Sequence, residues 1–335
     1  MKIGILGAGT WGIALAALLA NNNHDVTVWS ALPHEIDELK VNGKHKNLPN
    51  ATLPKNINYT KDIEIVADTE MILFVVPSSF IRTTTAKISP YIRDGVIIAS
   101  ATKGIEKASL MTMTDVIDDE LKLRGVTAKY SLAALSGPTH AEEVSIGIPT
   151  SIVAACENEA ISIRIADAFS NSCMRAYTNT DVLGVEISGA MKNIIALAAG
   201  INHGMGLGDN SKAMLMTRGI AEITRLGLAM GCKRRTFMGL AGIGDLIVTC
   251  TSRHSRNNRC GELIGMGKSY QEASEEIGMV VEGYHALEAA MEMSKKYDVE
   301  LPITEAVYKI IHDGLAPREA MQALMLRDLK SELDT

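Results

Sequence analysis

Lys192 is the residue whose sequence surroundings point most clearly to chemistry. It lies in Gly189–Asn193, where Lys192 and Asn193 interrupt the otherwise apolar, helix-like stretch Val182–Ala199. Because burial removes water from an ammonium group, we expect the pKa of such a lysine to fall until it exchanges protons near neutral pH. The alternative is a lysine that extends its ammonium group to the surface. The helix alone leaves both interpretations open.

A second lysine, Lys103, follows the short apolar run Val96–Ala99, which we expect to be a strand. The carboxyl ends of parallel strands line the crevice in which such sheets bind ligands. From there Lys103 could reach a phosphate or a carbonyl group, although a solvated lysine is the simpler alternative.

The segment Ser136–Ala141 follows another expected strand, Leu132–Leu135, and reaches the same edge of the sheet. Gly137 allows the backbone to approach a ligand closely, and Thr139 offers a hydroxyl group and an amide. His140 is expected to be solvated. The alternative is an ordinary turn between a strand and a helix.

A further segment joins a glycine bend to a run of basic residues. The glycines of Ala241–Asp245 let the chain present the Asp245 carboxylate at the bend. Ser255 is a predicted helix N-cap, which places Arg256 in the first turn, where free N–H groups and a guanidinium group suit a phosphate. The polar residues that could contact an anion here are Arg253, Ser255, Arg256, Asn257 and Arg259. The alternative is a solvated basic face.

The turn Gly7-Ala8-Gly9-Thr10-Trp11-Gly12 follows the expected strand Lys2–Leu6 and opens a helix. In this context the pattern predicts a dinucleotide-binding turn. The first glycine permits the tight turn, the second lets the backbone approach a pyrophosphate, and the third permits close packing of the helix on the strand. Thr10 and Trp11 would supply amides at the positive end of the helix.

The end of the second expected strand, Val26–Trp29, bears on the type of cofactor. An acid there would bind the ribose hydroxyl of NAD. The chain has Ser30 and Ala31 instead, with no acid before Glu35, which favours NADP or use of both cofactors. His34 could meet a 2′-phosphate, or it could be a solvated loop residue.

The elements around these residues divide the chain into two parts. Short apolar runs alternate with helix-like stretches up to about residue 180, which predicts a Rossmann domain with a doubly wound, mainly parallel sheet. The expected strands also include Met71–Val76 and Ser151–Ala155. From residue 181 to 335 only helical patterns occur, so we expect an all-α second domain that binds the substrate. Gly231 and Gly314 stand where helix ends need positive φ.

Composition excludes several classes of protein. Hydrophobic residues make up 47% of the 335 residues and charged residues 21%, which is enough for sizeable cores without disorder. A net charge of −6 does not provide the excess of positive charge that binding to nucleic acid or to an anionic membrane favours. The five cysteines are widely spaced, as expected of reduced thiols in a cytoplasmic protein. The beginning lacks a signal-peptide pattern, runs such as Ile13–Ala20 are too short to span a bilayer, and no metal-ligand cluster is visible.

Taken together, these segments resemble the bacterial NAD(P)-dependent glycerol-3-phosphate dehydrogenases over nearly the whole chain. The matching motifs are GAGTWG (7–12), VVPS (75–78), ATKGIE (101–106), SGPTHAEE (136–143), GAMKNIIALAAG (189–200), GLAGIGDLIVTCTS (239–252), SRN (255–257), VVEG (280–283) and LPITEAVY (301–308). The resemblance implies reduction of dihydroxyacetone phosphate to sn-glycerol 3-phosphate for phospholipid synthesis. It also implies a homodimer.

The resemblance assigns roles to individual residues. Lys192 is implied as the general acid and base, positioned with the substrate by Lys103 and Asp245. Substrate contacts are implied for Lys103, Gly137, Thr139, Lys192, Asp245, Ser255, Arg256 and Asn257. Cofactor contacts are implied for Gly7, Gly9, Thr10, Trp11, Gly12, Lys103, Ala141, Arg256, Val280 and Glu282. Ala31 departs from the basic or polar residue that the family often carries near the ribose, which leaves NAD and NADP both open.

Two other functions fit part of the pattern. Hydroxyacid and 6-phosphogluconate-type dehydrogenases share a Rossmann domain, a helical domain and a lysine on a helix, but the SRN segment and the glycine bend favour a phosphorylated substrate. A nucleotide-sensing protein could also retain the fold, because a fold alone does not prove activity. The combination of Lys103, Lys192 and Asp245 argues against a sensor.

Overall fold

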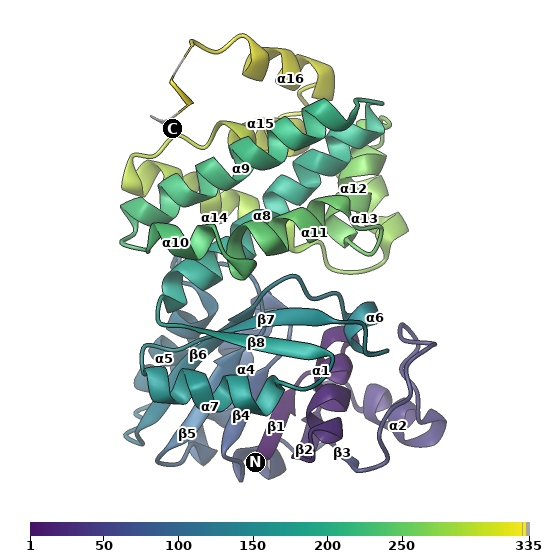
Figure 1. Cartoon of the computed structure of the whole chain (residues 1–335), viewed down its shortest axis with the longest axis vertical. Coiled ribbons are helices and arrows are strands. Elements are labelled where there is room, and N and C mark those ends of the chain that lie inside the picture. Colours follow the sequence, from purple (N-terminus) through teal and green to yellow (C-terminus); the bar gives the residue numbers. More distant parts are fainter. Residues whose placement is uncertain (330, 333–335) are drawn as a thin grey trace. The chain divides into compact units, whose positions relative to one another are not determined.

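The computed structural model describes residues 1–329 and 331–332. The chain forms two compact units, a sheet unit of Met1–Lys103 with Thr112–Val182 and a helical unit of Gly104–Met111 with the chain from Leu183 onward. Figure 1 shows the strands and helices of both. The short segment Gly104–Met111 leaves the sheet unit and returns to it, and Ile105 packs in the hydrophobic core of the helical unit.

The sheet unit contains eight strands in the order β3-β2-β1-β4-β5-β6-β7-β8. Their bounds are β1 Lys2–Leu6, β2 Asp25–Trp29, β3 Ile57–Thr60, β4 Met71–Phe74, β5 Val96–Ser100, β6 Tyr130–Ser136, β7 Thr150–Ala155 and β8 Met174–Asn179. All neighbours pair in parallel except β6 and β7, which are antiparallel. The predicted Rossmann domain with a mainly parallel sheet is confirmed.

The central strands are buried on both faces, as expected when helices cover both sides of a parallel sheet. Ile3 and Ile5 of β1 and Leu73 of β4 share one core with α1 (Thr10–Asn21) and α7 (Glu159–Phe169). Ile72 and Phe74 are equally buried, and strand alternation turns them to the opposite face. The other helices of this unit are α2 Pro33–Asn42, α3 Glu64–Ala67, α4 Ile81–Ile88, α5 Met113–Leu123 and α6 Ala141–Val144.

Two strands were not recognised from the sequence, for a physical reason. β3 lies at one edge of the sheet and β8 at the other. β8 buries only Met174 among its six residues, so it lacks the apolar run typical of a central strand. Edge strands with one open side carry a weaker hydrophobic signal than buried ones.

The helical unit is built around α8, Val182–Gly204. The other helices are α9 Asp209–Ala229, α10 Arg234–Phe237, α11 Asp245–Thr251, α12 Arg256–Gly265, α13 Tyr270–Ile277, α14 Glu282–Tyr297, α15 Pro302–His312 and α16 Pro317–Met325. The predicted all-α character is confirmed, and Gly231 and Gly314 have the positive φ expected of helix ends, +89° and +70°. The helices α10 and α11 have only four and seven residues, which is too short for periodicity to predict them from the sequence.

α8 is long and apolar enough to cross a membrane by length and composition, which corrects the expectation that every apolar run is too short. In the structure it is buried on all sides by the other helices of its unit. An all-round apolar sequence is also what the central helix of a helical core requires.

Glycines bring α8 and α12 into backbone contact. Gly200 and Gly204 of α8 face α12, and Gly261 and Gly265 of α12 face α8. A Cβ on Gly261 would overlap the carbonyl oxygen of Leu197. Residues four apart lie on one side of a helix, so these glycines form a continuous strip along which the backbones touch. The strip fixes α12 along the C-terminal part of α8.

Replacement of Gly261 by alanine tests this contact. Because the Cβ would overlap a backbone atom that cannot rotate away, we expect Gly261→Ala to lower the free energy of unfolding by about 1–3 kcal/mol or more. The control is Gly208→Ala, because a Cβ on Gly208 meets no atom within 4 Å, and this change should cost only the weaker N-cap of α9, about 1 kcal/mol at most. Urea unfolding followed by circular dichroism measures both. Equal stability of the two variants would contradict the glycine contact.

Candidate active site

The glycine turn sits at the carboxyl end of β1. Gly7 has φ +122°, and a Cβ there would lie 2.7 Å from the carbonyl oxygen of Val75 at the end of β4. A Cβ on Gly12 would overlap the Gly7 carbonyl oxygen. These two glycines therefore hold α1 against the strands, and the N–H of Gly7 donates to Trp29 O at 2.8 Å.

Gly9 differs from its two neighbours in the motif. A Cβ on Gly9 meets no atom within 4 Å, so protein packing does not require glycine there. Gly9 is the N-cap of α1, no side chain caps this helix end, and its first turn has no acid. Open space beside uncapped amides is the geometry that a pyrophosphate needs. The residues present therefore fit a dinucleotide, which the amides of Thr10 and Trp11 would help to hold.

The ends of β5 and β6 bring three predicted residues together. Lys103 Nζ donates to the carbonyl oxygen of Gly137 at 3.3 Å, and Thr139 Oγ1 donates to the same oxygen at 3.2 Å. Gly137 has φ +148°, and a Cβ there would lie 3.0 Å from Ser151 O on β7. Lys103, Gly137 and Thr139 thus form one cluster at the carboxyl edge of the sheet.

Ala141, the predicted cofactor contact beyond this cluster, begins α6 and packs against the core that contains α1. His140 precedes it and was expected to be solvated. That expectation is wrong in part, because His140 is half-buried and its Nε2 atom is shielded from solvent.

In the helical unit, Lys192 is 6% exposed, so it does not extend to the surface. Its Nζ donates to Asp245 Oδ1 and, at 2.6 Å, to Thr249 Oγ1. Asp245 is 1% exposed and opens α11, one turn before Thr249. An ammonium group and a carboxylate buried together offset much of each other's lost hydration.

Thr249 was not identified from the sequence. Its hydroxyl accepts from Lys192 and donates to the backbone oxygen of Asp245 at 2.6 Å. The signal was available in principle, because residues four apart share a face of a helix, but it required α11 to be recognised. The Lys192–Asp245–Thr249 set is named the lysine cluster below.

The thiol of Cys250, next to the lysine cluster, is expected to be unreactive. Burial raises the pKa of Cys250 to about 12, against a smaller opposing effect of the Lys192 charge. A neutral thiol is a poor nucleophile near neutral pH. The cluster therefore offers an ammonium group and a carboxylate, but no thiolate.

The SRN segment lies next to the lysine cluster through a pair of asparagines. Asn257 Nδ2 donates to Asn193 Oδ1 at 3.1 Å, and Asn257 Oδ1 accepts from the N–H of Gly283 at 2.9 Å. Asn193 is the residue after Lys192, so this bridge ties the first turn of α12 to α8 and to the beginning of α14. Ser255 is confirmed as the N-cap of α12, because its Oγ accepts from Asn258 N at 3.2 Å.

Arg256 stands in this first turn with its guanidinium group exposed. No hydrogen bond or ion pair engages it among the residues that the structure describes. Val280 is 38% exposed and Glu282 begins α14, in the segment that the asparagine bridge reaches. An exposed guanidinium group beside helix N–H groups is suited to a phosphate.

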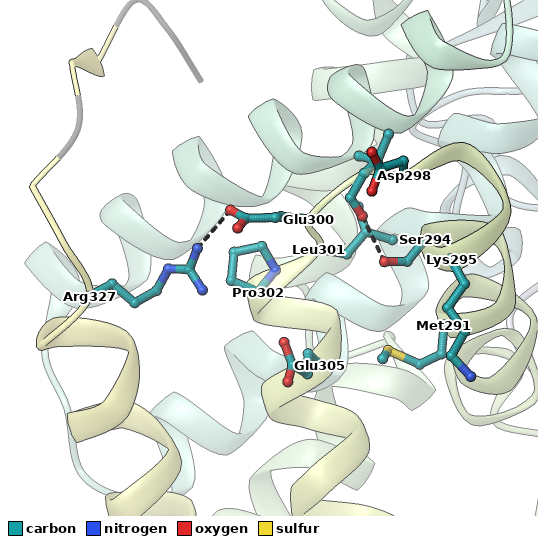
Figure 2. Close-up of a pocket in the computed structure, with 10 residues that line it drawn as sticks. Met291, Ser294, Lys295, Asp298, Glu300, Leu301, Pro302, Glu305 and Arg327 are labelled. Atoms are coloured by element: carbon teal, nitrogen blue, oxygen red, sulfur yellow. Dashed lines mark hydrogen bonds and ion pairs between the residues drawn. The ribbon is translucent and has the colours of Figure 1, made fainter.

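A separate pocket of about 280 Å³ opens between the end of α14, the beginning of α15 and Arg327. Figure 2 shows Arg327 reaching toward Glu300, to which it donates a hydrogen bond at 2.9 Å. Ser294 Oγ donates to Val299 O at 2.6 Å. Two further charged residues of the lining pair with residues outside it, Lys295 with Glu292 and Glu305 with Lys309. None of the predicted site residues lines this pocket, which is therefore separate from the lysine cluster.

A Rossmann unit with a cofactor-type glycine turn, joined in one chain to a helical unit with a buried lysine, defines the class of nicotinamide-dependent dehydrogenases. Family models place the chain more closely. The model of the N-terminal part of NAD-dependent glycerol-3-phosphate dehydrogenase matches residues 2–162, and that of the C-terminal part matches residues 181–322. The chain belongs to this family.

Individual relatives agree with this assignment. A curated NAD(P)+-dependent glycerol-3-phosphate dehydrogenase of Lactobacillus delbrueckii subsp. bulgaricus is 55% identical, over 99% of each chain. One from Enterococcus faecalis is 45% identical, over 99% of this chain and 97% of the relative. The solved glycerol-3-phosphate dehydrogenase of Coxiella burnetii superposes with a TM-score of 0.91 at 36% identity, over 97% of this chain and 99% of that one.

The open space at Gly9 yields a prediction that separates binding from folding. We expect Gly9→Ala to raise the dissociation constant for NADH or NADPH by about 10-fold or more, because the methyl group would occupy the place of the pyrophosphate. The melting temperature should stay within about 2 °C of wild type, since the methyl group meets no protein atom. Fluorescence titration and thermal unfolding measure the two effects. Unchanged affinity would remove this turn from the cofactor site.

The hydroxyl group of Thr249 yields a second prediction. We expect Thr249→Val to lower kcat by about 10-fold with little change in KM, because Lys192 loses a hydrogen bond that orients it. Thr249→Ser should restore most of the activity. The matched control is Thr251→Val, which removes an equivalent hydroxyl that bonds Ile247 O at 2.8 Å on the exposed side of the same helix. Equal kcat values for the two valine variants would contradict the role of Thr249.

Proposed function

We propose that the chain catalyses the reversible reduction of dihydroxyacetone phosphate to sn-glycerol 3-phosphate with NADH or NADPH. The observation that carries this proposal is the buried lysine cluster, tied by the asparagine bridge to the phosphate-suited first turn of α12, in a chain of the glycerol-3-phosphate dehydrogenase family.

The proton in this reaction comes from Lys192. A reduced nicotinamide, when bound, supplies the hydride that adds to the ketone carbon. As the C=O bond becomes a C–H and an O–H bond, negative charge builds on the oxygen, and the Lys192 ammonium group stabilises that charge and donates the proton. Asp245 and Thr249 hold Nζ in place, so no reorientation is needed as charge develops.

The phosphate of the substrate is assigned to the first turn of α12. Arg256 offers a guanidinium group that no residue of the described chain engages, and the helix adds partial positive charge. Ser255 and Asn257 are proposed as further substrate contacts in the same turn. Binding energy far from the reacting carbon orients the ketone for hydride transfer.

The residues at the carboxyl edge of the sheet are proposed to serve the cofactor and the other end of the substrate. Gly9, Thr10 and Trp11 are proposed to contact the pyrophosphate, Gly7 and Gly12 to hold the turn that presents them, and Ala141 to add to the same surface. Lys103, Gly137 and Thr139 are proposed to contact the substrate, with Lys103 also near the cofactor. Val280, Glu282 and Arg256 complete the proposed cofactor contacts.

The product is the backbone of glycerophospholipids, so we propose that the chain supplies their synthesis. A cytoplasmic homodimer is proposed with it. The five cysteines support the cytoplasm as its location, because none forms a disulfide and four are buried. Its small-molecule partner is a phosphorylated triose.

The direct test is loss of reduced-nicotinamide absorbance on addition of dihydroxyacetone phosphate. Wild type should turn over, and Arg256→Ala should raise the KM for this substrate by about 10–100-fold, because a charged hydrogen bond to phosphate is lost. Arg259→Ala, on an exposed arginine of the same helix, is the matched control and should change KM little. No turnover by folded wild type would refute the function. An unchanged KM in Arg256→Ala would remove this arginine from the phosphate site.

A further inference from the structure

The cofactor specificity of the chain depends on what stands at the end of β2. In dinucleotide-binding Rossmann units, an acid there accepts hydrogen bonds from the adenosine ribose. This chain has Ser30 at that place, and Ser30 is 6% exposed. Its hydroxyl donates to Glu35 Oε2 at 2.5 Å and accepts from the N–H of Leu32 at 3.1 Å. The acid missing from the strand end is thus supplied from the first turn of α2.

Other contacts place this carboxylate beside the glycine turn. Gly7 N donates to Trp29 O, and Trp29 is the residue before Ser30. The loop after α2 returns to the same place, because Asn47 Nδ2 donates to Thr10 Oγ1 at 3.2 Å. Two residues before Asn47, His45 is close enough to Glu35 for the carboxylate to act on its charge.

The carboxylate groups of α2 are Glu35, Asp37 and Glu38. Asp37 is paired with Lys61, so Glu35 and Glu38 carry the negative charge that remains, with Lys40 on the same helix and Lys46 beside His45. Burial is the largest effect on His45 and lowers its pKa, so this ring adds little positive charge at neutral pH. Ala31 offers no polar group, and His34 is exposed. The fixed Glu35 carboxylate repels a phosphate dianion and suits a neutral diol.

Glu35 also has an oxygen to offer. Oε2 is engaged by Ser30, while Oε1 has no hydrogen-bond partner among the described residues. A carboxylate fixed through one oxygen and open at the other is an acceptor for two neighbouring hydroxyl groups, and it has no donor for a phosphate.

We propose that Glu35, positioned by Ser30, accepts the adenosine ribose hydroxyls and makes this chain prefer NADH to NADPH. The inference rests on the proposed function only in that the chain binds a nicotinamide cofactor. The strand end itself has no acid, which on its own favoured NADP. The Ser30–Glu35 hydrogen bond brings the Glu35 carboxylate to the strand end, and this reverses the expected preference.

The test is the ratio of dissociation constants for NADPH and NADH, measured by fluorescence titration without substrate. Wild type should bind NADH at least ~10-fold more tightly, as expected when a charged acceptor favours the diol and repels the phosphate. Glu35→Gln should reduce this ratio by ~10-fold, mainly through tighter NADPH binding as the repulsion is lost. Ser30→Ala should reduce it less, since it loosens the carboxylate without removing it.

The matched control is Asp37→Asn. Asp37 lies on the same helix but pairs with Lys61 at 2.7 Å. The Asp37→Asn substitution should therefore leave the ratio of dissociation constants unchanged. Equal or tighter binding of NADPH by wild type would overturn the proposal, as would an unchanged ratio in Glu35→Gln. The binding titration contains no substrate, so it is independent of the turnover assay. If wild type prefers NADH in the titration but does not reduce dihydroxyacetone phosphate, only the proposed function is refuted.

Discussion

The buried ammonium group of Lys192 needs a carboxylate partner, and Asp245 provides it. The packing of the helical unit depends on keeping these two groups in contact. Removing either partner of such a pair leaves an uncompensated buried charge, which costs about 3–5 kcal/mol. α8 and α11 must therefore stay packed so that Lys192 and Asp245 remain in contact. The glycine strip between α8 and α12 and the asparagine bridge then fix the SRN turn against the same part of α8.

The sheet unit supplies a different kind of chemistry. At the carboxyl edge of its sheet, the glycine turn presents backbone N–H groups. Gly7 and Gly12 hold this turn in place, and the space beside Gly9 is open. Backbone amides and a helix end recognise phosphate groups without a mobile side chain, so they suit a cofactor that must bind in one orientation. The helical unit holds charged side chains instead, the buried Lys192–Asp245 pair and the exposed Arg256.

Local patterns predicted much of this from the sequence. The glycine turn follows from its place between a strand and a helix, and Lys192 stood out because it interrupts an apolar helix. Thr249, the Asn193–Asn257 bond and the Ser30–Glu35 bond were not predicted, because they depend on α11 being a helix or on partners that only the fold brings together. Edge strands such as β8 escaped because one open face removes the apolar pattern. The periodicity of apolar residues in the sequence indicates which faces are buried, but it does not indicate which polar side chains form hydrogen bonds with each other.

The most direct test of the lysine cluster is the single-turnover rate of hydride transfer from NADH to dihydroxyacetone phosphate in Lys192→Ala, measured with and without added methylammonium. The account predicts a rate about 10²–10⁴-fold below wild type, an unchanged dissociation constant for NADH, and partial recovery with methylammonium. A rate close to wild type, or a loss of NADH affinity as large as the loss of rate, would contradict the assignment of Lys192 as the proton donor.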